Sequence, residues 1–146
     1  MAPTPGPVDG YISVGFEQLG NFPMEWAAGT PLTPERAVSL DAQIPKPIRA
    51  LDGEKVLVSG FMLPTRYEKG LAVEFLLMRS QLTCCYGIVP QPNEWIVVRM
   101  PGSGITPTMD VPVSFFGRFH VGAHCENTLL EGIYYLDGER MADARS

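Results

Sequence analysis

The chain has few basic residues and no cluster of them. Lys and Arg number 11 against 16 Asp and Glu, so the formal charge is −5. The cations are scattered from Arg36 to Arg145 with no run among them. A chain with this balance repels phosphate backbones and anionic lipid surfaces. Nucleic acid is therefore not an expected partner.

The chain also lacks long apolar runs and a leader-like beginning. Phe75–Met78 is typical of its longest apolar runs, whereas a membrane span needs roughly 18 such residues. The proline-rich segment Met1–Pro7 has neither the basic n-region nor the apolar h-region of a signal peptide. We expect no transmembrane segment. The chain as written is expected to be cytoplasmic, or periplasmic if a signal has been removed.

Cysteine is scarce, and glycine and proline are abundant. Three cysteines are an odd number and indicate no secreted disulfide framework. At 146 residues, the chain is long enough to bury a core without staples. Its 15 glycines and 14 prolines are typical of many turns between short strands. We expect one domain rich in β-strands.

From residue 51 onward the apolar residues alternate with a period of two, which predicts strands. Glycine in the middle of the first strand, at Gly60, predicts a bend at which one strand serves two sheets. In the second strand Leu71, Val73, Phe75 and Leu77 are expected to form one apolar face. The predicted strands cover residues 55–63, 71–78, 95–100, 111–121 and 132–136. In the fourth of these the odd positions should face the core and the even ones the solvent.

These elements predict an all-β, mainly antiparallel fold, a small OB-like five-stranded barrel over residues 44–140. Residues 1–43 are expected to form an N-terminal arm with a weak strand and one short helix, and 141–146 a tail. The helix is predicted for residues 33–40, because Thr33 can cap it and Pro34 suits its first position. The segment 101–110 is too short and too rich in Gly and Pro for the usual OB helix.

The residue types that carry chemistry gather around Cys84 and Cys85. Together with His124 and Cys125 they are candidate ligands for zinc or copper, and His120 is a further candidate. Adjacent cysteines chelate one ion poorly, because neighbouring strand side chains point to opposite faces. We also expect the 79–94 loop and the loop near His124 to open at opposite ends of the barrel.

Two alternatives to a metal site remain open for the cysteines. One cysteine can be a small buried hydrophobe while the other packs or stays free. A disulfide between Cys125 and either Cys84 or Cys85 requires an oxidising compartment. A cysteine nucleophile needs a histidine base within reach, and His120 and His124 are poorly placed for that.

No phosphate loop, dinucleotide fingerprint, G-x-S-x-G elbow or H-E-x-x-H motif is present. We therefore expect that the protein is not an enzyme and has no catalytic residue. We also expect no cofactor, and the alternative is a bound zinc or copper ion. In the segment 90–95, Asn93 is expected to tie down the preceding loop and Trp95 to fill the mouth of the barrel.

An ordered series of motifs resembles an uncharacterised bacterial family of domains of unknown function, DUF3299. The motifs span about residues 44–138. They are Ile44-Pro45, Leu51-Asp52-Gly53, Val56-x-Val58-x-Gly60-Phe61-Met62-Leu63-Pro64, Glu74-Phe75-Leu76-Leu77, Cys84-Cys85-Tyr86-Gly87, Pro92-Asn93-Glu94-Trp95, Val111-Pro112-Val113 and Gly132-Ile133-Tyr134. The resemblance implies a domain often carried on secreted proteins or lipoproteins. Some members lie near transporter components, which implies an accessory or metal-handling role.

The leading hypothesis is a non-catalytic accessory or structural subunit that docks to a larger, possibly membrane-associated protein assembly. The arm Met1–Gly10 is the expected docking segment, because proline-rich arms order well along a partner. The alternative is a metal-binding module that uses the vicinal cysteines. Binding of oligonucleotides or oligosaccharides rests on the fold alone, which does not by itself imply function.

Overall fold

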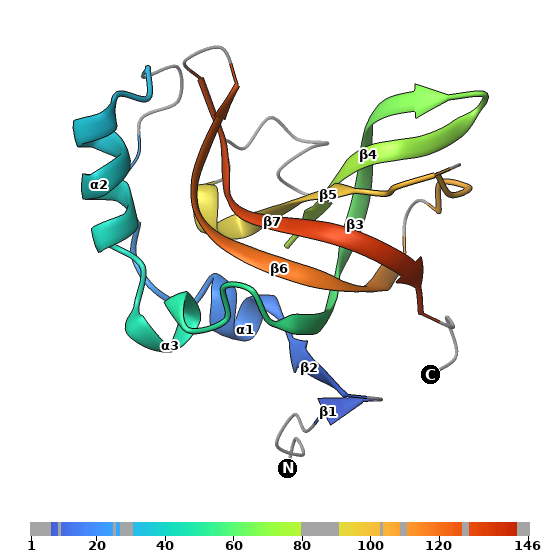
Figure 1. The fold of residues 1–146 in the computed structure, drawn as a ribbon, viewed down its shortest axis with the longest axis horizontal. Coiled ribbons are helices and arrows are strands. Elements are labelled where there is room, and N and C mark those ends of the chain that lie inside the picture. The colour runs from blue at the N-terminus through green and yellow to red at the C-terminus, as the bar shows by residue number, and fades with distance from the viewer. Residues whose placement is uncertain are drawn as a thin grey trace.

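A computed structural model describes residues 7–8, 10–24, 26, 31–79, 91–102, 104–108, 111–126 and 129–142, without the side chains of 7, 8, 124–126 and 129. The elements are β1 (Pro7–Val8), β2 (Tyr11–Val14), α1 (Phe16–Leu19), α2 (Pro34–Ala42), α3 (Lys46–Arg49), β3 (Lys55–Glu68), β4 (Leu71–Met78), the 3-10 turn η1 (Pro92–Glu94), β5 (Trp95–Arg99), β6 (Pro112–Glu126) and β7 (Leu129–Met141). Strands dominate this part of the chain, as the alternation predicted (Figure 1). None of the described helices is long and apolar enough to cross a membrane.

The five long strands close into a ring. Their order is β3-β4-β5-β7-β6, and β6 pairs back with β3. All neighbours are antiparallel except β5 and β7, which are parallel. This is the strand order of an OB-type barrel, so the predicted fold class is confirmed, and each predicted strand lies within or overlaps one of the five.

Strand β3 bends at Gly60 and serves both sides of the barrel, as the mid-strand glycine predicted. Residues 55–61 pair with β6, and residues 61–68 pair with β4. A Cβ on Gly60 would lie 2.9 Å from the carbonyl oxygen of Met78 and 3.1 Å from the Cβ of Leu77. Glycine is therefore required where β3 lies against the end of β4.

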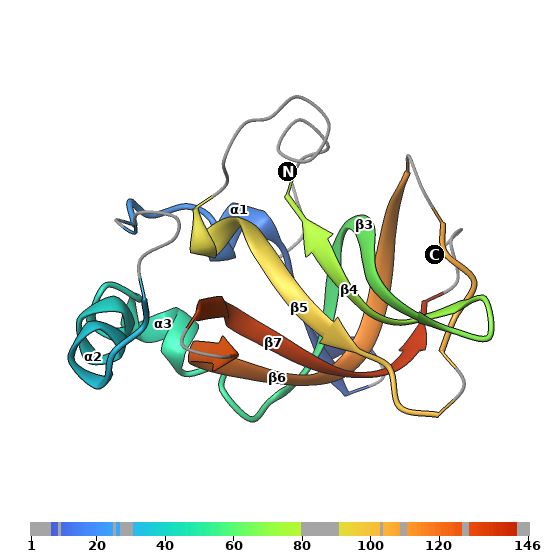
Figure 2. The ribbon, with the colours of Figure 1, turned by 90° about the horizontal axis from the view of Figure 1, so that it is seen from above.

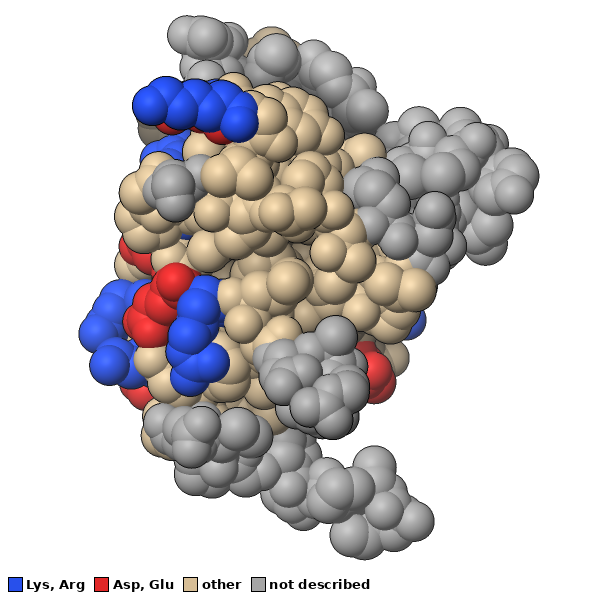
Figure 3. All heavy atoms as spheres, turned by 90° about the vertical axis from the view of Figure 1, so that its right-hand side faces the viewer, with Lys and Arg blue, Asp and Glu red and all other residues tan. Residues whose placement is uncertain are grey.

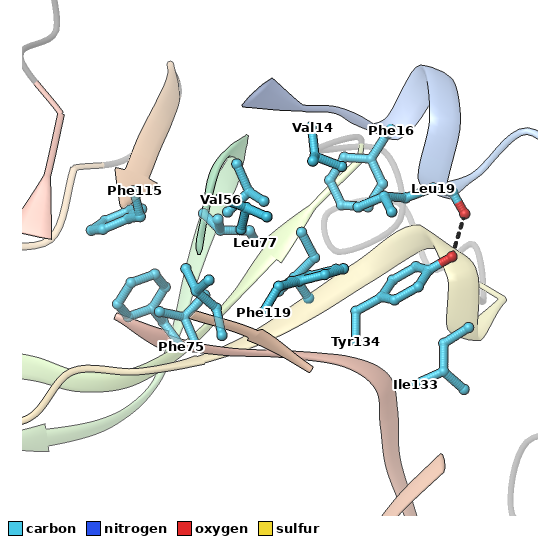
Figure 4. Close-up of a cluster of buried hydrophobic side chains, with 14 of the residues drawn as sticks. Val14, Phe16, Leu19, Val56, Phe75, Leu77, Phe115, Phe119, Ile133 and Tyr134 are labelled. Carbon is cyan, nitrogen blue, oxygen red and sulfur yellow. Dashed lines mark hydrogen bonds between the residues drawn. The ribbon is translucent and has the colours of Figure 1, made fainter. Parts of the chain in front are cut away.

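The core lies inside this ring and is rich in aromatic side chains. Phe75 packs against Phe115 with 4.9 Å between ring centroids, and Phe119 stacks on Tyr134 at 5.6 Å. All four are fully buried. Figure 4 shows these rings converging with apolar residues from β3 and β4.

Two predicted apolar faces differ from the observed ones in part. In β6 the odd positions from Val113 to Phe119 are buried, but Val111 precedes the strand and is half exposed. In β4, Phe75 and Leu77 are in the core as predicted, whereas Ala72 takes the core position expected for Val73. The β3–β4 pairing shifts register around Arg66, which breaks the alternation between Ala72 and Phe75.

The N-terminal segment carries more helix than the sequence predicted. The expected helix is α2, and the side chain of Thr33 accepts a hydrogen bond from the backbone N–H of Arg36. Two further helices of four residues, α1 and α3, flank it, and α3 begins directly after Pro45. Figure 2 shows α2 and α3 at one end of the barrel and the β3–β4 hairpin at the other.

Helix α1 supplies the cover that an OB barrel usually takes from a helix between its third and fourth strands. Phe16 and Leu19 are buried against the core. The hydroxyl of Tyr134 donates a hydrogen bond of 2.7 Å to the carbonyl oxygen of Leu19, drawn as a dashed line in Figure 4. The described residues of the 101–110 segment form no helix, as its composition predicted.

Side-chain carboxylates cover the edge of β6 where it runs past the start of β3. The backbone N–H of Val121 donates to Asp52 at 2.8 Å, and that of Ala123 donates to Asp41 at 2.7 Å. These N–H groups would otherwise face outward without a neighbouring strand, and open edges promote unwanted pairing. The segment that carries α2 and α3 therefore takes the place of a further strand.

We expect Tyr134→Phe to lower the free energy of unfolding by about 1–2 kcal/mol, because it removes the donor to the Leu19 carbonyl. Burial raises the pKa of Tyr134 in the folded protein. The neutral phenol therefore stabilises the fold fully below its unfolded pKa of about 10, and this contribution is lost as the pH rises further. Urea unfolding of both proteins at about pH 8 and about pH 11 should show a deficit that shrinks at the higher pH. A deficit that is the same at both pH values would contradict this assignment.

Candidate functional site

The outer face of the barrel carries a row of charged side chains directly opposite one another on neighbouring strands. We call this set the charged row. Its members, in order around the barrel, are Arg66 (β3), Glu74 (β4), Arg99 (β5), Asp137 (β7), Arg118 (β6) and Lys55 (β3 again). The signs alternate from Arg66 to Arg118. Opposite charges at facing positions stabilise a sheet, whereas like charges there destabilise it.

Two ion pairs hold one part of the charged row. Arg99 donates from Nε and Nη2 to Glu74 Oε2 at 3.0 and 2.8 Å. Arg66 donates from Nη2 to Glu68 Oε2 at 2.9 Å. The hydrogen bonds that Arg99 donates to Glu74 raise the pKa of Arg99, and partial burial opposes that rise. Figure 3 shows the side of the molecule where the β3–β4 hairpin lies, with basic and acidic side chains next to one another.

A pocket of about 360 Å³ opens where the charged row meets the β3–β4 hairpin. We call it the hairpin pocket. Its lining consists of Arg66, Glu68, Val73, Glu74, Arg99, Met100, Pro101, Gly102 and Asp137. Small-molecule pockets occupy about 300–1,000 Å³, so this one lies at the lower end of that range. Its rim is charged and its floor is apolar.

A histidine adjoins the pocket through Asp137. His120 Nε2 lies 2.8 Å from Asp137 Oδ2, and His120 Nδ1 lies 4.0 Å from Asp52 Oδ1. Tyr135 lies between this group and Arg99, whose guanidinium carbon is 5.3 Å from the ring centroid. Burial raises the pKa of Tyr135, and the positive charge of Arg99 partly offsets that effect. The charged groups at the pocket are thus paired with one another.

The predicted metal and thiol residues fall largely outside the described part of the chain. Cys84 and Cys85 lie wholly outside it, as do the side chains of His124 and Cys125, whose backbone belongs to β6. Within the described residues, no group of three or more His, Cys, Asp or Glu is arranged to hold a metal ion. The metal site, the disulfide and the free-thiol alternative therefore stay predictions.

The expectation that the two candidate loops open at opposite ends of the barrel is wrong. Strands β5 and β7 run parallel, so the start of β5 lies at the same end as the start of β7. The indole Nε1 of Trp95 donates to the carbonyl oxygen of Glu131 at 2.9 Å, which joins the two strand starts directly. Cys125 pairs with Leu130 in the β6–β7 hairpin at this same end.

Asn93 and Trp95 hold the start of β5 in place, with partners that the sequence did not reveal. Asn93 is 3% exposed, and its Nδ2 donates to the carbonyl oxygen of Phe22 at 2.8 Å. Asn93 thus ties η1 to the N-terminal segment. The sequence had predicted that it would tie down the loop preceding it in the chain. Trp95 is half buried, and its bond to Glu131 places it against β7.

No protein-family model and no curated protein matches the chain. Among solved structures, a crystal structure of a DUF3299 family protein from Pseudomonas aeruginosa is similar, with a TM-score of 0.60 and 21% sequence identity. The match covers 90% of this chain and 94% of that chain. The fold is of the DUF3299 type. The structural similarity thereby confirms, at the level of the fold, the resemblance seen in the sequence motifs. It gives no information about activity.

The hairpin pocket was missed at the level of sequence, although part of its signal was present. Glu74, Arg99 and Asp137 are charged residues within or beside apolar strand runs, and such breaks mark the solvent face of a strand. Their alignment in one row depends on strand register, which the sequence alone did not reveal. The position of Val73 depends on the register shift near Arg66.

A double-mutant cycle can measure the pairing within the charged row. We expect Glu74→Ala and Arg99→Ala to show a coupling energy of about 0.5–1 kcal/mol, because Glu74 is only 16% exposed and two hydrogen bonds join the pair. The matched control is the pair Arg66 and Glu68, whose side chains are 60% and 54% exposed. It should show no measurable coupling in the same urea unfolding experiment. Equal coupling in both pairs would contradict the role of burial.

Proposed function

We propose that this domain is a non-catalytic accessory subunit that docks onto a larger protein assembly through its N-terminal arm. The observation that carries the proposal is the position of β1. The strand order begins with β1, and the ring closes from β6 to β3. Among the described strands, β1 is therefore the terminal one, and its outer edge is open to a further strand.

The root of the arm is fixed firmly to the barrel. Strand β2 pairs in parallel with β3 at Ile12–Val14, and β1 pairs with β2. The ring of Tyr11 packs edge-on against Phe116 at 4.9 Å, and its hydroxyl donates to Glu139. Figure 1 shows β1 and β2 projecting from the barrel near the N-terminus. The arm thus leaves the domain from a defined place.

The composition of this segment suits contact with a protein. Residues 1–16 contain a single charged side chain, Asp9. The segment carries prolines at positions 3, 5 and 7. Extended proline-rich segments also bind aromatic-lined grooves with little loss of conformational entropy. Pairing of a further strand with β1 and binding of the proline-rich segment in a groove would both require a protein partner.

Co-purification of the tagged chain from its native cells tests this proposal. Three versions are compared: the full chain, a chain lacking residues 1–6, and a control lacking residues 143–146. The first deletion leaves β1 intact. We expect a complex of defined stoichiometry with the full chain and with the control. The N-terminal deletion should reduce recovery of the partner about tenfold or more. Monomers in all three cases, or the same complex in all three, would refute the docking role of the arm.

A metal-binding module is the second candidate, and the parallel pairing of β5 and β7 favours it. This pairing brings the chain that flanks Cys84 and Cys85 to the same end of the barrel as the β6–β7 hairpin with His124 and Cys125. Thiolate and imidazole ligands suit zinc or copper. The proposal is a site composed of these four residues.

Metal content by mass spectrometry after purification without chelator tests the second candidate. Cys84→Ser and Cys125→Ser should each abolish stoichiometric zinc or copper, because each removes a thiolate ligand. His120→Gln is the matched control, since His120 is bound to Asp137 in the charged row and should leave the metal in place. A metal-free wild-type protein, or metal retained in both cysteine variants, would eliminate this candidate.

A further inference from the structure

The hairpin pocket lies apart from the arm and has balanced charge at its rim. In Figure 1 the β3–β4 hairpin lies at the upper right and β1 at the bottom. Three ion pairs or hydrogen-bonded pairs surround the pocket: Arg66 with Glu68, Arg99 with Glu74, and His120 with Asp137. Because charges of both signs face the opening, neither a purely anionic nor a purely cationic ligand is favoured.

The rim retains hydrogen-bonding capacity of both kinds. Both bonds from Arg99 end on one oxygen, Glu74 Oε2, so Arg99 Nη1 and Glu74 Oε1 take no part in them. Arg66 uses one nitrogen, Nη2, in its bond to Glu68. A guanidinium offers five donors in a fixed fork, and a carboxylate accepts on two oxygens. Charged donors and charged acceptors are thus available side by side.

The outer pair, Arg66 and Glu68, is open to exchange with a ligand. Its side chains are 60% and 54% exposed. They lie two residues apart on β3, on the same face of the strand, and bond to each other. Exposed ion pairs contribute little to stability, so separating this one is not costly. A ligand that carries a carboxylate and an ammonium would replace the pair by two charge-assisted bonds without changing the net charge of the site.

The floor of the pocket is apolar and held by the backbone. Val73 and Met100 are each 6% exposed, and the N–H of Met100 donates to the carbonyl oxygen of Val73 at 2.8 Å. Pro101 and Gly102, both exposed, complete the lining beside it. Methionine adapts its shape to an apolar group, and the 360 Å³ volume suits a small molecule.

We propose that the hairpin pocket binds a small zwitterion with an apolar body, of which an apolar α-amino acid is the simplest form. Arg66 takes the carboxylate, Glu68 takes the ammonium, and the apolar body lies over Val73, Met100 and Pro101. This binding does not depend on the docking of the arm.

Titration of the isotope-labelled full chain with L-leucine, followed by NMR, tests the proposal. We expect shifts centred on Arg66, Glu68 and Met100, and a Kd below about 1 mM. Isocaproate lacks the ammonium, isoamylamine lacks the carboxylate, and glycine lacks the apolar body. Each should bind about tenfold or more weakly than leucine. Absence of shifts at the pocket, or equal binding of leucine and isoamylamine, would overturn the proposal.

Two variants separate recognition from a structural effect. Arg66→Gln should lower the affinity for leucine to that of the wild type for isoamylamine. Glu68→Gln should lower it to that of the wild type for isocaproate. Lys69→Gln, at the tip of the same hairpin and outside the pocket lining, is the control and should leave leucine binding unchanged. Deletion of residues 1–6 should also leave it unchanged. If Arg66→Gln and Glu68→Gln bind leucine as the wild type does, the assigned contacts are wrong.

Discussion

Pairing of β3 with β6 closes the barrel, and the positions of the core, the charged row and the hairpin pocket depend on that closure. The pairing requires β3 to bend so that its first half reaches β6 and its second half β4. Gly60 permits the bend because a Cβ there would meet the backbone of Met78 and the side chain of Leu77. Once the ring is closed, the barrel strands have no open edge over the paired residues, and the aromatic side chains of β4, β6 and β7 fill the interior.

Closure also explains how an acidic chain places charges of both signs next to one another. In a closed ring, each outward position on one strand faces a defined position on the next, so Arg66, Glu74, Arg99 and Asp137 are aligned by register alone. Because the signs alternate, facing side chains attract one another, whereas like charges at these positions would repel. Where the β3–β4 register shifts, Val73 leaves the core face and becomes the floor of the pocket. The pocket is thus a consequence of one irregularity in an otherwise regular ring.

The edges that closure leaves outside the ring are treated in two ways. Beyond the start of β3, the carboxylates of Asp41 and Asp52 accept the hydrogen bonds that a further strand would accept from β6. At the other edge, β1 carries no such cover among the described residues and continues into the proline-rich arm. This difference between a covered and an open edge is the physical basis for the proposal that the N-terminal arm docks onto a partner.

The sequence by itself determined the strands, the barrel class and the first position of α2, because period-two alternation, mid-strand glycine and a Thr-Pro start are local signals. It also predicted that Asn93 ties down a neighbouring segment and that Trp95 fills the mouth of the barrel. It did not reveal their partners Phe22 and Glu131, which lie 71 and 36 residues away along the chain. Only the tertiary structure decided which charges face one another, which end of the barrel each loop occupies and where Val73 lies. These properties follow from strand register and from the parallel pairing of β5 with β7, and register arises from contacts between distant segments that no local pattern specifies.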